Sequence, residues 1–451
     1  MKSNLDNKNL LGTSPISEVF VKYAIPSVIA LLFFGVQNII DGIIVGKHLS
    51  SDALGGVNII LPFYSILIVI SFVIGVGSLT IVSIGAGENN INKSQDAIST
   101  GFWALLVTAS VITVILFFYA KDFALLLGAN KELLPFALSY LNGLFPFIIP
   151  ITLGFYSGSI LRATGHPNFS MTSMLITTLI NLILSPVFVI FLKLGVMGAS
   201  LATGISFTIG LIISGYISFN PKQKYAMYKG KFRQNLLGKI IYNGSSEGVS
   251  ELGTAITVLI INYTVVKFSG SDGVAAFTAI NYVNLIGVLI FIGISEGLVP
   301  VLSYNFGAKN YNRVKAILRF AVKINIIIGL LFLTIVQVWG SSILQLFFES
   351  SNSKVIRIAT LGLSIYSFVF LVNGLNILAT SFFTSLEDAR TSIIISVLRG
   401  ILFVILGVTV LSKFLGINGV WIALPLAEVL TLIFSVYFLV YKNKQLSAIE
   451  I

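Results

Sequence analysis

Two carboxylates lie inside a long apolar stretch near the middle of the chain, and their spacing suits proton or cation binding. The apolar run covers about 236–266 and contains Glu247 and Glu251 within the segment NGSSEGVSELGT. On a helix the polar side chains of this segment share one face: Asn243, Glu247, Ser250, Glu251 and Thr254. One acid at mid-membrane is unfavourable by about 2.5–3.5 kcal/mol, so two on one stripe indicate a water-filled cavity.

Glu247 and Glu251 are four residues apart, which puts their Cβ atoms about 5–6 Å from each other on a helix. Two negative charges at that distance in a low dielectric resist joint ionisation. We therefore expect the pair to share a proton and to titrate as a unit. A proton-binding stripe that faces an internal cavity indicates coupled transport.

Three further acids lie in apolar runs. Asp41 has no Lys or Arg at comparable depth in its run, so a functional role is expected, with solvation at the membrane interface as the alternative. Glu296 lies in the kinkable segment GISEGLVP, where a functional role and simple hydrogen bonding to neighbouring helices are both open. Glu428 follows Pro425 and is predicted to be structural, because nothing else polar lines up with it.

Oxygen-bearing side chains in the next runs suit a hard cation such as sodium, provided that they converge with Asp41. Asn181 and Ser185 share a helix face, and Thr203 lies in the following run. Ordinary interhelical hydrogen bonding, worth roughly 0.6–2 kcal/mol, is the alternative. Four tyrosines are candidates for receiving flat cationic compounds through cation–π contacts: Tyr140, Tyr156, Tyr263 and Tyr282.

The composition identifies the elements that must position these residues. Of 451 residues, 56% are hydrophobic and 10% are charged, whereas a soluble domain has about 25% charged residues. The chain is therefore predicted to be an all-α membrane protein. It has no cysteine, which excludes thiolate chemistry, and its two histidines, His48 and His166, fall in predicted loops on opposite sides of the membrane. We expect no cofactor, no histidine metal site and no cleavable signal peptide.

Twelve apolar runs are long enough to span a bilayer, which puts both termini on one side. They lie at about 19–46, 53–84, 97–120, 133–160, 168–192, 196–219, 236–266, 273–305, 314–339, 355–381, 391–413 and 417–441. Basic residues crowd the central linker, from Lys222 to Arg233, and the loops assigned to its side, including Arg390 and Arg399. The positive-inside rule then predicts that both termini and the linker are cytoplasmic. We interpret the net charge of +11 as a signal of membrane topology, and we expect the basic residues to contact lipid rather than nucleic acid.

The two halves repeat. LGVMGA at 194–199 is echoed by LGINGV about 220 residues later, and Gly85-Ala86 by Gly307-Ala308 at a similar spacing. Six spans per copy make a parallel repeat of two six-helix bundles, with substrate between them. Pro26 and Pro300 are predicted hinges, since proline inside a helix removes a hydrogen bond. The predicted domains are an N-terminal segment (1–18), an N-lobe (19–219), a basic linker (220–235), a C-lobe (236–441) and a tail (442–451).

Several stretches resemble the MATE multidrug exporters. They are Ala24-Ile25-Pro26, NIIDGIIVGKHLSSDALGGV (38–57) and LGVMGASLAT (194–203), while SEGLVPVLSYNFGAKN (295–310) and GVSELG (248–253) look most like the MepA-type branch. The resemblance covers nearly the whole chain. It implies a cation-coupled antiporter for bulky, often cationic compounds, in which two bundles form a V-shaped central cleft that opens alternately to either side.

The resemblance also implies a cation site in the N-lobe, carried here by Asp41, Asn181 and Thr203. One departure concerns the family pattern Asn-x-x-x-Asp-Pro, which reads Asn181-Leu-Ile-Leu-Ser185-Pro here, so a serine replaces the second carboxylate. A sodium site would lose one of its two charges. We therefore predict that Asp41, helped by the C-lobe glutamates including Glu296, carries protons, with sodium as the alternative.

The sequence thus predicts a monomeric multidrug efflux transporter in the plasma membrane of a bacterium, acting on small organic cations. A flippase for lipid-linked saccharides is a second transport hypothesis, but its cavity should carry Arg or Lys for a pyrophosphate. An enzyme would need a nucleophile–base pair or a metal cluster at depth, and none is visible. A membrane sensor or scaffold without transport would have no use for duplicated lobes and buried acids.

Overall fold

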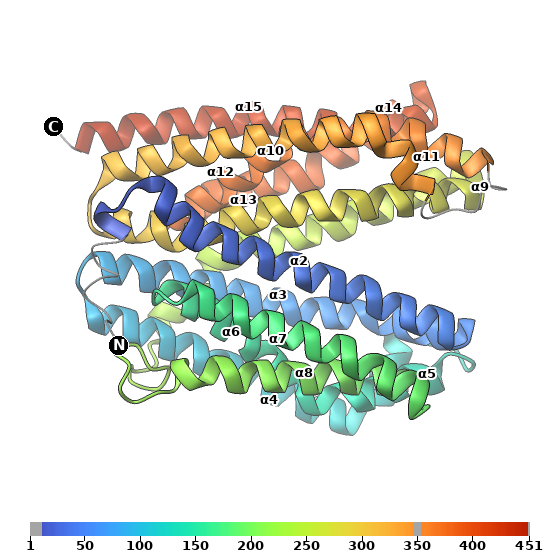
Figure 1. Cartoon of the computed structure of the whole chain (residues 1–451), viewed down its shortest axis with the longest axis horizontal. Coiled ribbons are helices and arrows are strands. Elements are labelled where there is room, and N and C mark those ends of the chain that lie inside the picture. The colour runs from blue at the N-terminus through green and yellow to red at the C-terminus, as the bar shows by residue number, and fades with distance from the viewer. Residues whose placement is uncertain (1–10, 346–352, 450–451) are drawn as a thin grey trace. The chain divides into compact units, whose positions relative to one another are not determined.

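The computed structural model describes residues 11–345 and 353–449, and every regular element within them is helical. Within each half of the chain the helices run side by side along nearly one direction (Figure 1). Of the predicted termini, residues 1–10 and 450–451 lie outside the described residues. The elements in chain order are α2 (Ile16–His48), α3 (Ser51–Gly87), α4 (Ile91–Leu126), α5 (Leu134–Leu144), η1 (Phe145–Phe147), α6 (Ile148–Ala163), α7 (Pro167–Pro186), η2 (Val187–Phe191), α8 (Gly195–Ser218), α9 (Gln234–Gly307), α10 (Tyr311–Gln345), α11 (Ser353–Tyr366), η3 (Ser367–Leu371), α12 (Asn373–Ser385), α13 (Ala389–Val397), η4 (Leu398–Leu402), α14 (Phe403–Leu415) and α15 (Ile417–Ile449).

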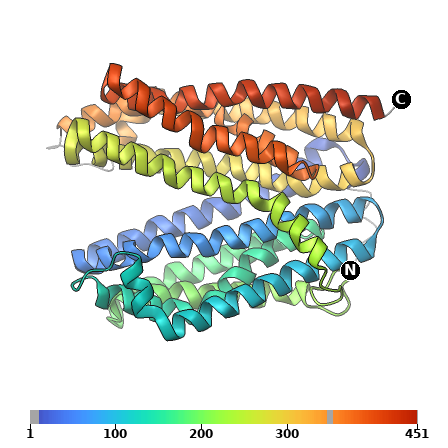
Figure 2. The same ribbon diagram turned by 180° about the vertical axis from the view of Figure 1, so that it is seen from behind.

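Eleven helical stretches of the described chain are long and apolar enough to cross a bilayer. One of them, α9, has 74 residues, which is roughly 110 Å of helix against a hydrocarbon core about 30 Å thick. Its helical course breaks at Gly270, where φ is 58° and ψ is −144°, so α9 supplies two spans; its course can be followed in Figure 2. The prediction of twelve spans in an all-α membrane protein is confirmed.

Irregular backbone positions recur in the two halves. Six of the nine described residues with positive φ pair up about 220 positions apart: Asn89 with Lys309, Gly165 with Glu387, and Gly195 with Gly416. The 3₁₀ turns η1 and η3 interrupt the fourth and the tenth spans. A π-helical turn, η2, ends the fifth span, and another, η4, lies within the eleventh. Matching interruptions at one spacing confirm that a six-helix unit is duplicated.

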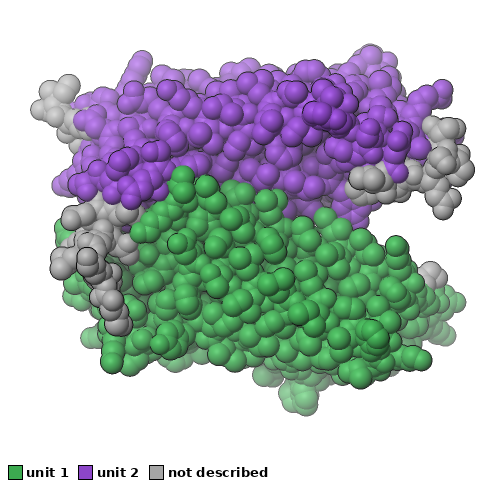
Figure 3. Space-filling model, in the orientation of Figure 1, with its two compact units in different colours: residues 1–7, 21–244 green, residues 8–20, 245–451 purple. Residues whose placement is uncertain are grey.

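The chain forms two compact units, which Figure 3 distinguishes by colour. Unit 1 comprises residues 21–244, and unit 2 comprises residues 245–451 together with the short segment 8–20, so far as these are described. Both divisions fall inside a helix, in α2 and in α9. Each unit therefore contains the first turns of a helix that continues in the other, and the linker 220–235 belongs to unit 1.

The linker is held against the N-terminal end of α4. Asp96 accepts a hydrogen bond from Lys231 N at 2.7 Å and forms an ion pair with Arg233 at 3.0 Å. Three more α4 side chains bond to linker backbone: Gln95 to Lys224 O, Ser99 to Met227 O and Gly230 N, and Thr100 to Arg233 N. Because these bonds recur at each turn of α4, the linker is an ordered part of unit 1.

We expect Asp96→Ala to free the linker and to speed tryptic cleavage after Lys231 and Arg233, because two backbone-fixing contacts are lost at once. Limited proteolysis of the detergent-solubilised protein measures this rate. Glu88→Ala is the matched control, since Glu88 pairs with Lys93 at the same end of the unit without touching the linker. Equal cleavage rates in the two variants would contradict this account of the linker.

The first turns of α9 pack on α3 through glycines. A Cβ placed on Gly77 would collide with Ile240 O, and one on Gly244 would collide with Val73 O. Such close approach of two helix backbones is typical of small residues at membrane helix crossings. The crossing fixes the beginning of α9 in unit 1.

Gly244→Ala is therefore expected to lower the thermal stability, by about 1–3 kcal/mol in unfolding free energy, because the added methyl group meets backbone that cannot rotate away. Gly238→Ala in the same helix has open space around its Cβ and should be neutral or stabilising by up to about 1 kcal/mol. Thermal melting in detergent compares the two variants, and a Gly244→Ala protein as stable as Gly238→Ala would refute the close crossing.

Candidate functional site

The N-lobe residues named from the sequence converge in unit 1. Asp41 lies on α2, Asn181 on α7 and Thr203 on α8. Hydrogen bonding assigns the orientation of the Asn181 amide: its nitrogen donates to both Asp41 oxygens at 3.1 Å, and its oxygen accepts from Thr203 Oγ1 at 3.3 Å. Side chains of α2, α7 and α8 thus form one series of hydrogen bonds that ends at the Asp41 carboxylate.

Further neutral polar groups surround Asp41. Ser185 and Gln37 lie close enough to interact with the carboxylate, although Ser185 Oγ makes no hydrogen bond of ordinary geometry. The phenol groups of Tyr64 and Tyr140 lie within electrostatic range of it. Tyr140 was predicted to bind substrate, and the structure brings it near the predicted ion site. The sequence reasoning missed Gln37 and Tyr64, although Gln37 lies four residues before Asp41 on the same helix face.

The burial and charge of its residues determine what this site can bind. Asn181 and Ser185 are fully buried and Gln37 is 1% exposed, whereas Asp41 itself is half-buried. Among the ion pairs of the described chain none involves Asp41. The carboxylate is therefore held by neutral groups, with one side open. It can take up a proton, or share a small cation with the Thr203 hydroxyl and an inverted Asn181 amide.

The C-lobe acids lie in unit 2, around Arg399 of η4. Glu296 is 5% exposed, Glu247 is half-buried and Glu251 is exposed. Glu247 interacts electrostatically with the other two acids and with Arg399, and Glu251 interacts with Glu296 and Arg399. The structure thus brings the three predicted acids together, but with a basic group beside them.

The assignment of Arg399 to a cytoplasmic loop is wrong. Arg399 lies inside the span Ala389–Leu415, and its Nε donates to Glu428 Oε1 at 3.0 Å. Asn373 and Asn376 donate to the same carboxylate at 2.6 and 2.7 Å. The statement that nothing polar lines up with Glu428 is also wrong, because its partners come from other helices. A sequence signal existed: Arg399 falls in the middle of the apolar run 391–413.

A close helix crossing positions Arg399. A Cβ on Gly253 or on Gly400 would lie within 3.0 Å of the other glycine's Cα, so α9 and η4 nearly touch there. Thr257 donates to Gly400 O at 3.2 Å, and Ser250 donates to Ser396 at 3.0 Å. The π-helical turn leaves carbonyl groups to be satisfied, and α9 supplies donors for them. Arg399 is thereby fixed next to the helix that carries Glu247 and Glu251.

The other predicted site residues are spread over both units. Tyr156 is fully buried and donates to Ile98 O at 2.6 Å, which gives it a packing role in unit 1. Tyr263 and Tyr282 of α9 are 80% and 38% exposed. Pro26 and Pro300 lie inside α2 and α9, which stay helical through them, and their role as hinges remains a prediction.

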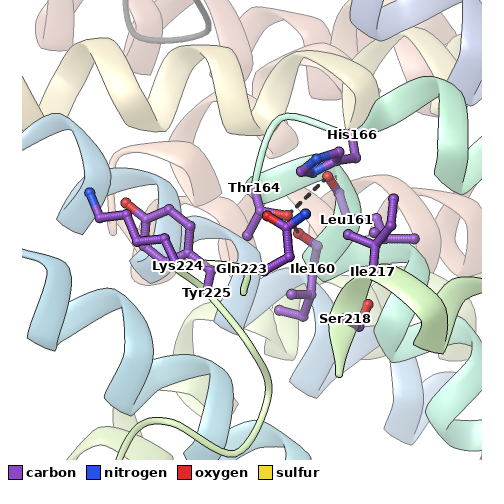
Figure 4. A pocket seen from close by; sticks show the side chains of 9 residues that line it. All are labelled: Ile160, Leu161, Thr164, His166, Ile217, Ser218, Gln223, Lys224 and Tyr225. Carbon is purple, nitrogen blue, oxygen red and sulfur yellow. Dashed lines mark hydrogen bonds between the residues drawn. The ribbon is translucent and has the colours of Figure 1, made fainter. Parts of the chain in front are cut away.

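A small pocket in unit 1 lies apart from all these residues (Figure 4). It is lined by the end of α6, by Thr164 and His166 of the turn between α6 and α7, by the end of α8 and by linker residues. None of the predicted site residues lines it. Among the described residues, no group of three His, Asp or Glu side chains is placed to hold a metal ion.

Comparisons with known proteins fit this geometry. The MatE family model matches the chain twice, over residues 26–187 and 249–409. The multidrug export protein MepA of Staphylococcus haemolyticus is 28% identical over 433 residues, covering 95% of this chain and 94% of that protein. MepA of Staphylococcus aureus (strain NCTC 8325) is 25% identical over 426 residues, covering 92% and 91%.

Solved structures agree in fold. An outward-facing multidrug resistance MATE family transporter superposes with a TM-score of 0.91 at 20% identity, covering 100% of both chains. A MATE protein in complex with MaL6 gives the same TM-score and identity over 98% of both chains. Because the family model covers most of the sequence in two copies, this protein belongs to the MatE family of membrane transporters and is not an enzyme.

Proposed function

We propose that the protein is a secondary active multidrug efflux transporter, which exchanges protons, or sodium, for bulky lipophilic cations by alternating access. The observation that carries this proposal is Asp41, a half-buried carboxylate held by neutral partners in a membrane span. The relatives named as multidrug export proteins, which align over nearly their whole length, support the class of substrate.

In this proposal Asp41 is the group that binds the coupling ion. The ionised carboxylate attracts a cationic compound or a cation, and protonation cancels that attraction. The Asn181 amide, itself bonded to Thr203, holds the carboxylate in place, and the Ser185 hydroxyl lies nearby. Hydroxyl and amide groups can donate or accept as needed, so they suit both states of the carboxylate. Reciprocal linkage then requires that proton and substrate oppose each other's binding.

The half-buried Glu247 and the exposed Glu251 give unit 2 a negative surface that suits the same cationic substrates. Tyr140, Tyr263 and Tyr282 are proposed to contact the flat parts of the substrate by cation–π interaction. Tyr156 is left out of this set, because it is fully buried and its hydroxyl is bonded to Ile98 O. Tyr140 is also buried, but it lies near Asp41. We propose a monomer in the plasma membrane of a bacterium, with both termini in the cytoplasm.

Transport in proteoliposomes tests the coupling ion. The probe is a cationic dye such as ethidium. In sodium-free buffer, an imposed proton gradient should drive movement of the dye against a concentration difference. A sodium gradient at equal pH on both sides should drive little movement. Movement under the sodium gradient alone would transfer the coupling role to sodium, and no movement under either gradient would reject antiport.

A lipid-linked saccharide flippase is the weaker hypothesis. It needs basic groups to hold a pyrophosphate, and Arg399 is the basic side chain found beside the C-lobe acids. Glu428 already pairs with Arg399, so this base offers no net positive charge to an anionic lipid. A sensor or scaffold without transport is disfavoured by the relatives that are named as exporters.

A further inference from the structure

The carboxylate of Glu428 accepts three side-chain hydrogen bonds, two from α12 and one from η4. Oε1 accepts from Asn373 Nδ2 at 2.6 Å and from Arg399 Nε at 3.0 Å, and Oε2 accepts from Asn376 Nδ2 at 2.7 Å. Glu428 is 7% exposed and both asparagines are at most 4% exposed. An ionised acid this deeply buried requires a counter-cation, and Arg399 provides it.

The asparagines are turned the wrong way for a free metal ion. Asn376 is fixed on both sides, because its nitrogen also donates to Glu428 O at 2.8 Å and its oxygen accepts from Ser435 Oγ at 2.9 Å. Asn373 Nδ2 likewise faces Glu428, while Asn373 Oδ1 lies buried without a partner. Sodium would need these amide oxygens turned toward the carboxylate. The amide donors therefore favour an ionised Glu428 carboxylate whose charge is balanced by the Arg399 guanidinium rather than by a free metal ion.

Arg399 also lies near a second set of acids. Its charge acts on Glu247 and on Glu251, which belong to the neighbouring helix α9. Within the described chain its guanidinium makes one recorded ion pair, through Nε to Glu428, and its side chain is 19% exposed. One arginine thus balances a buried carboxylate and lies beside the acids of α9.

We propose that Arg399 is a built-in cation of unit 2: its guanidinium takes the position next to Glu428 that a free cation would otherwise fill, so that unit 2 loads no coupling ion of its own. The exchanged ion then binds at Asp41 in unit 1. Only the consequence for transport, that the exchanged ion binds at Asp41 and not in unit 2, rests on the proposed function. The occupancy of the Glu428 position by Arg399 is testable without transport.

Removing the arginine should open a cation site. Arg399→Ala is made in a protein that also carries Asp41→Asn, so that the N-lobe site does not contribute to the comparison. Its thermal melting is measured in detergent at equal ionic strength, with choline, sodium or low-millimolar guanidinium as the cation. We expect a low Tm in choline that rises by several degrees with guanidinium and by a smaller amount with sodium. The protein with Arg399 intact should melt at one temperature in all three salts.

Two further variants separate this role from packing alone. Arg399→Ala combined with Glu428→Gln has no charge to balance, so its Tm should not respond to either cation. Arg399→Lys keeps the charge and should behave as the intact protein. If Arg399→Ala cannot be purified, Arg399→Gln asks the same question, because its amide fills volume without charge.

Equal melting of Arg399→Ala in the three salts would overturn the proposal, and so would an equal cation response after Glu428→Gln is added. In proteoliposomes the same substitution, with Asp41 intact, should make dye export depend on guanidinium or sodium. Loss of export in the unaltered protein would instead reject the proposed function, while the melting result would still decide the role of Arg399.

Discussion

Asp41→Asn is expected to reduce export driven by a proton gradient strongly while the protein still folds. Asparagine keeps the size of the side chain and an oxygen for the Asn181 amide, but it can neither bind nor release a proton. Coupling energies between two ligands usually correspond to factors of about 5–150, so the rate of gradient-driven dye export should fall by that order. Dye flux in proteoliposomes at an imposed pH gradient measures the loss.

The matched control is Asp52→Asn, which changes an exposed acid at the start of α3 in the same unit. It should export at the unaltered rate. Thermal melting of both variants in detergent ensures that a loss of transport is not a loss of folded protein. Export by Asp41→Asn at the unaltered rate would remove Asp41 from the coupling mechanism.

Glu428→Ala is expected to be the most destabilising single substitution discussed. It leaves the Arg399 guanidinium buried without its carboxylate, and it leaves Asn373 and Asn376 without their acceptor. Breaking one side of a buried ion pair typically lowers the free energy of unfolding by about 3–5 kcal/mol. A fall in Tm, or a failure to accumulate in the membrane, reports this loss.

Asp272→Ala provides the contrast, since Asp272 pairs with Lys354 at 2.9 Å on the exposed surface of unit 2. Exposed ion pairs contribute little, so its Tm should hardly change. If both substitutions lowered the Tm equally, the Arg399–Glu428 pair would not contribute more stability than an exposed ion pair.

The sequence predicted the architecture well because length and apolar content alone decide whether a helix spans a bilayer. The repeat spacing near 220 residues predicted a duplicated unit, and the matched positive-φ positions Asn89 and Lys309 agree with it. The sequence did not predict that the units divide inside α2 and α9. That division depends on close crossings such as Gly244 on Val73 and on the contacts of the linker with Asp96. Neither has a local sequence signature.

The sequence predicted most residues of the candidate site in unit 1, but its prediction of the charged residues in unit 2 was incomplete. Asn181 and Ser185 could be put on one face by their spacing, while their convergence with Asp41 came from the family resemblance. Arg399 was misassigned because it was counted by the positive-inside rule with the loop residues, although it lies inside the apolar run 391–413. Its actual partner, Glu428, lies on a different helix, and sequence spacing carries no information on contacts between helices.

Tyr156 illustrates a further limit. Aromatic side chains in spans can face lipid, a cavity or the protein interior, and only packing distinguishes these environments. Tyr156 donates to Ile98 O inside unit 1, whereas Tyr140 lies near Asp41. Their sequence contexts are alike, and their neighbours on other helices are not.

Proton release on substrate binding tests the central claim most directly. In weakly buffered detergent solution, adding tetraphenylphosphonium to the purified protein should release protons, and the amount released should fall sharply in Asp41→Asn but not in Asp52→Asn. Substrate binding by the unaltered protein with no release of protons at any pH between about 5 and 8 would contradict the exchange of a proton for a cation at Asp41.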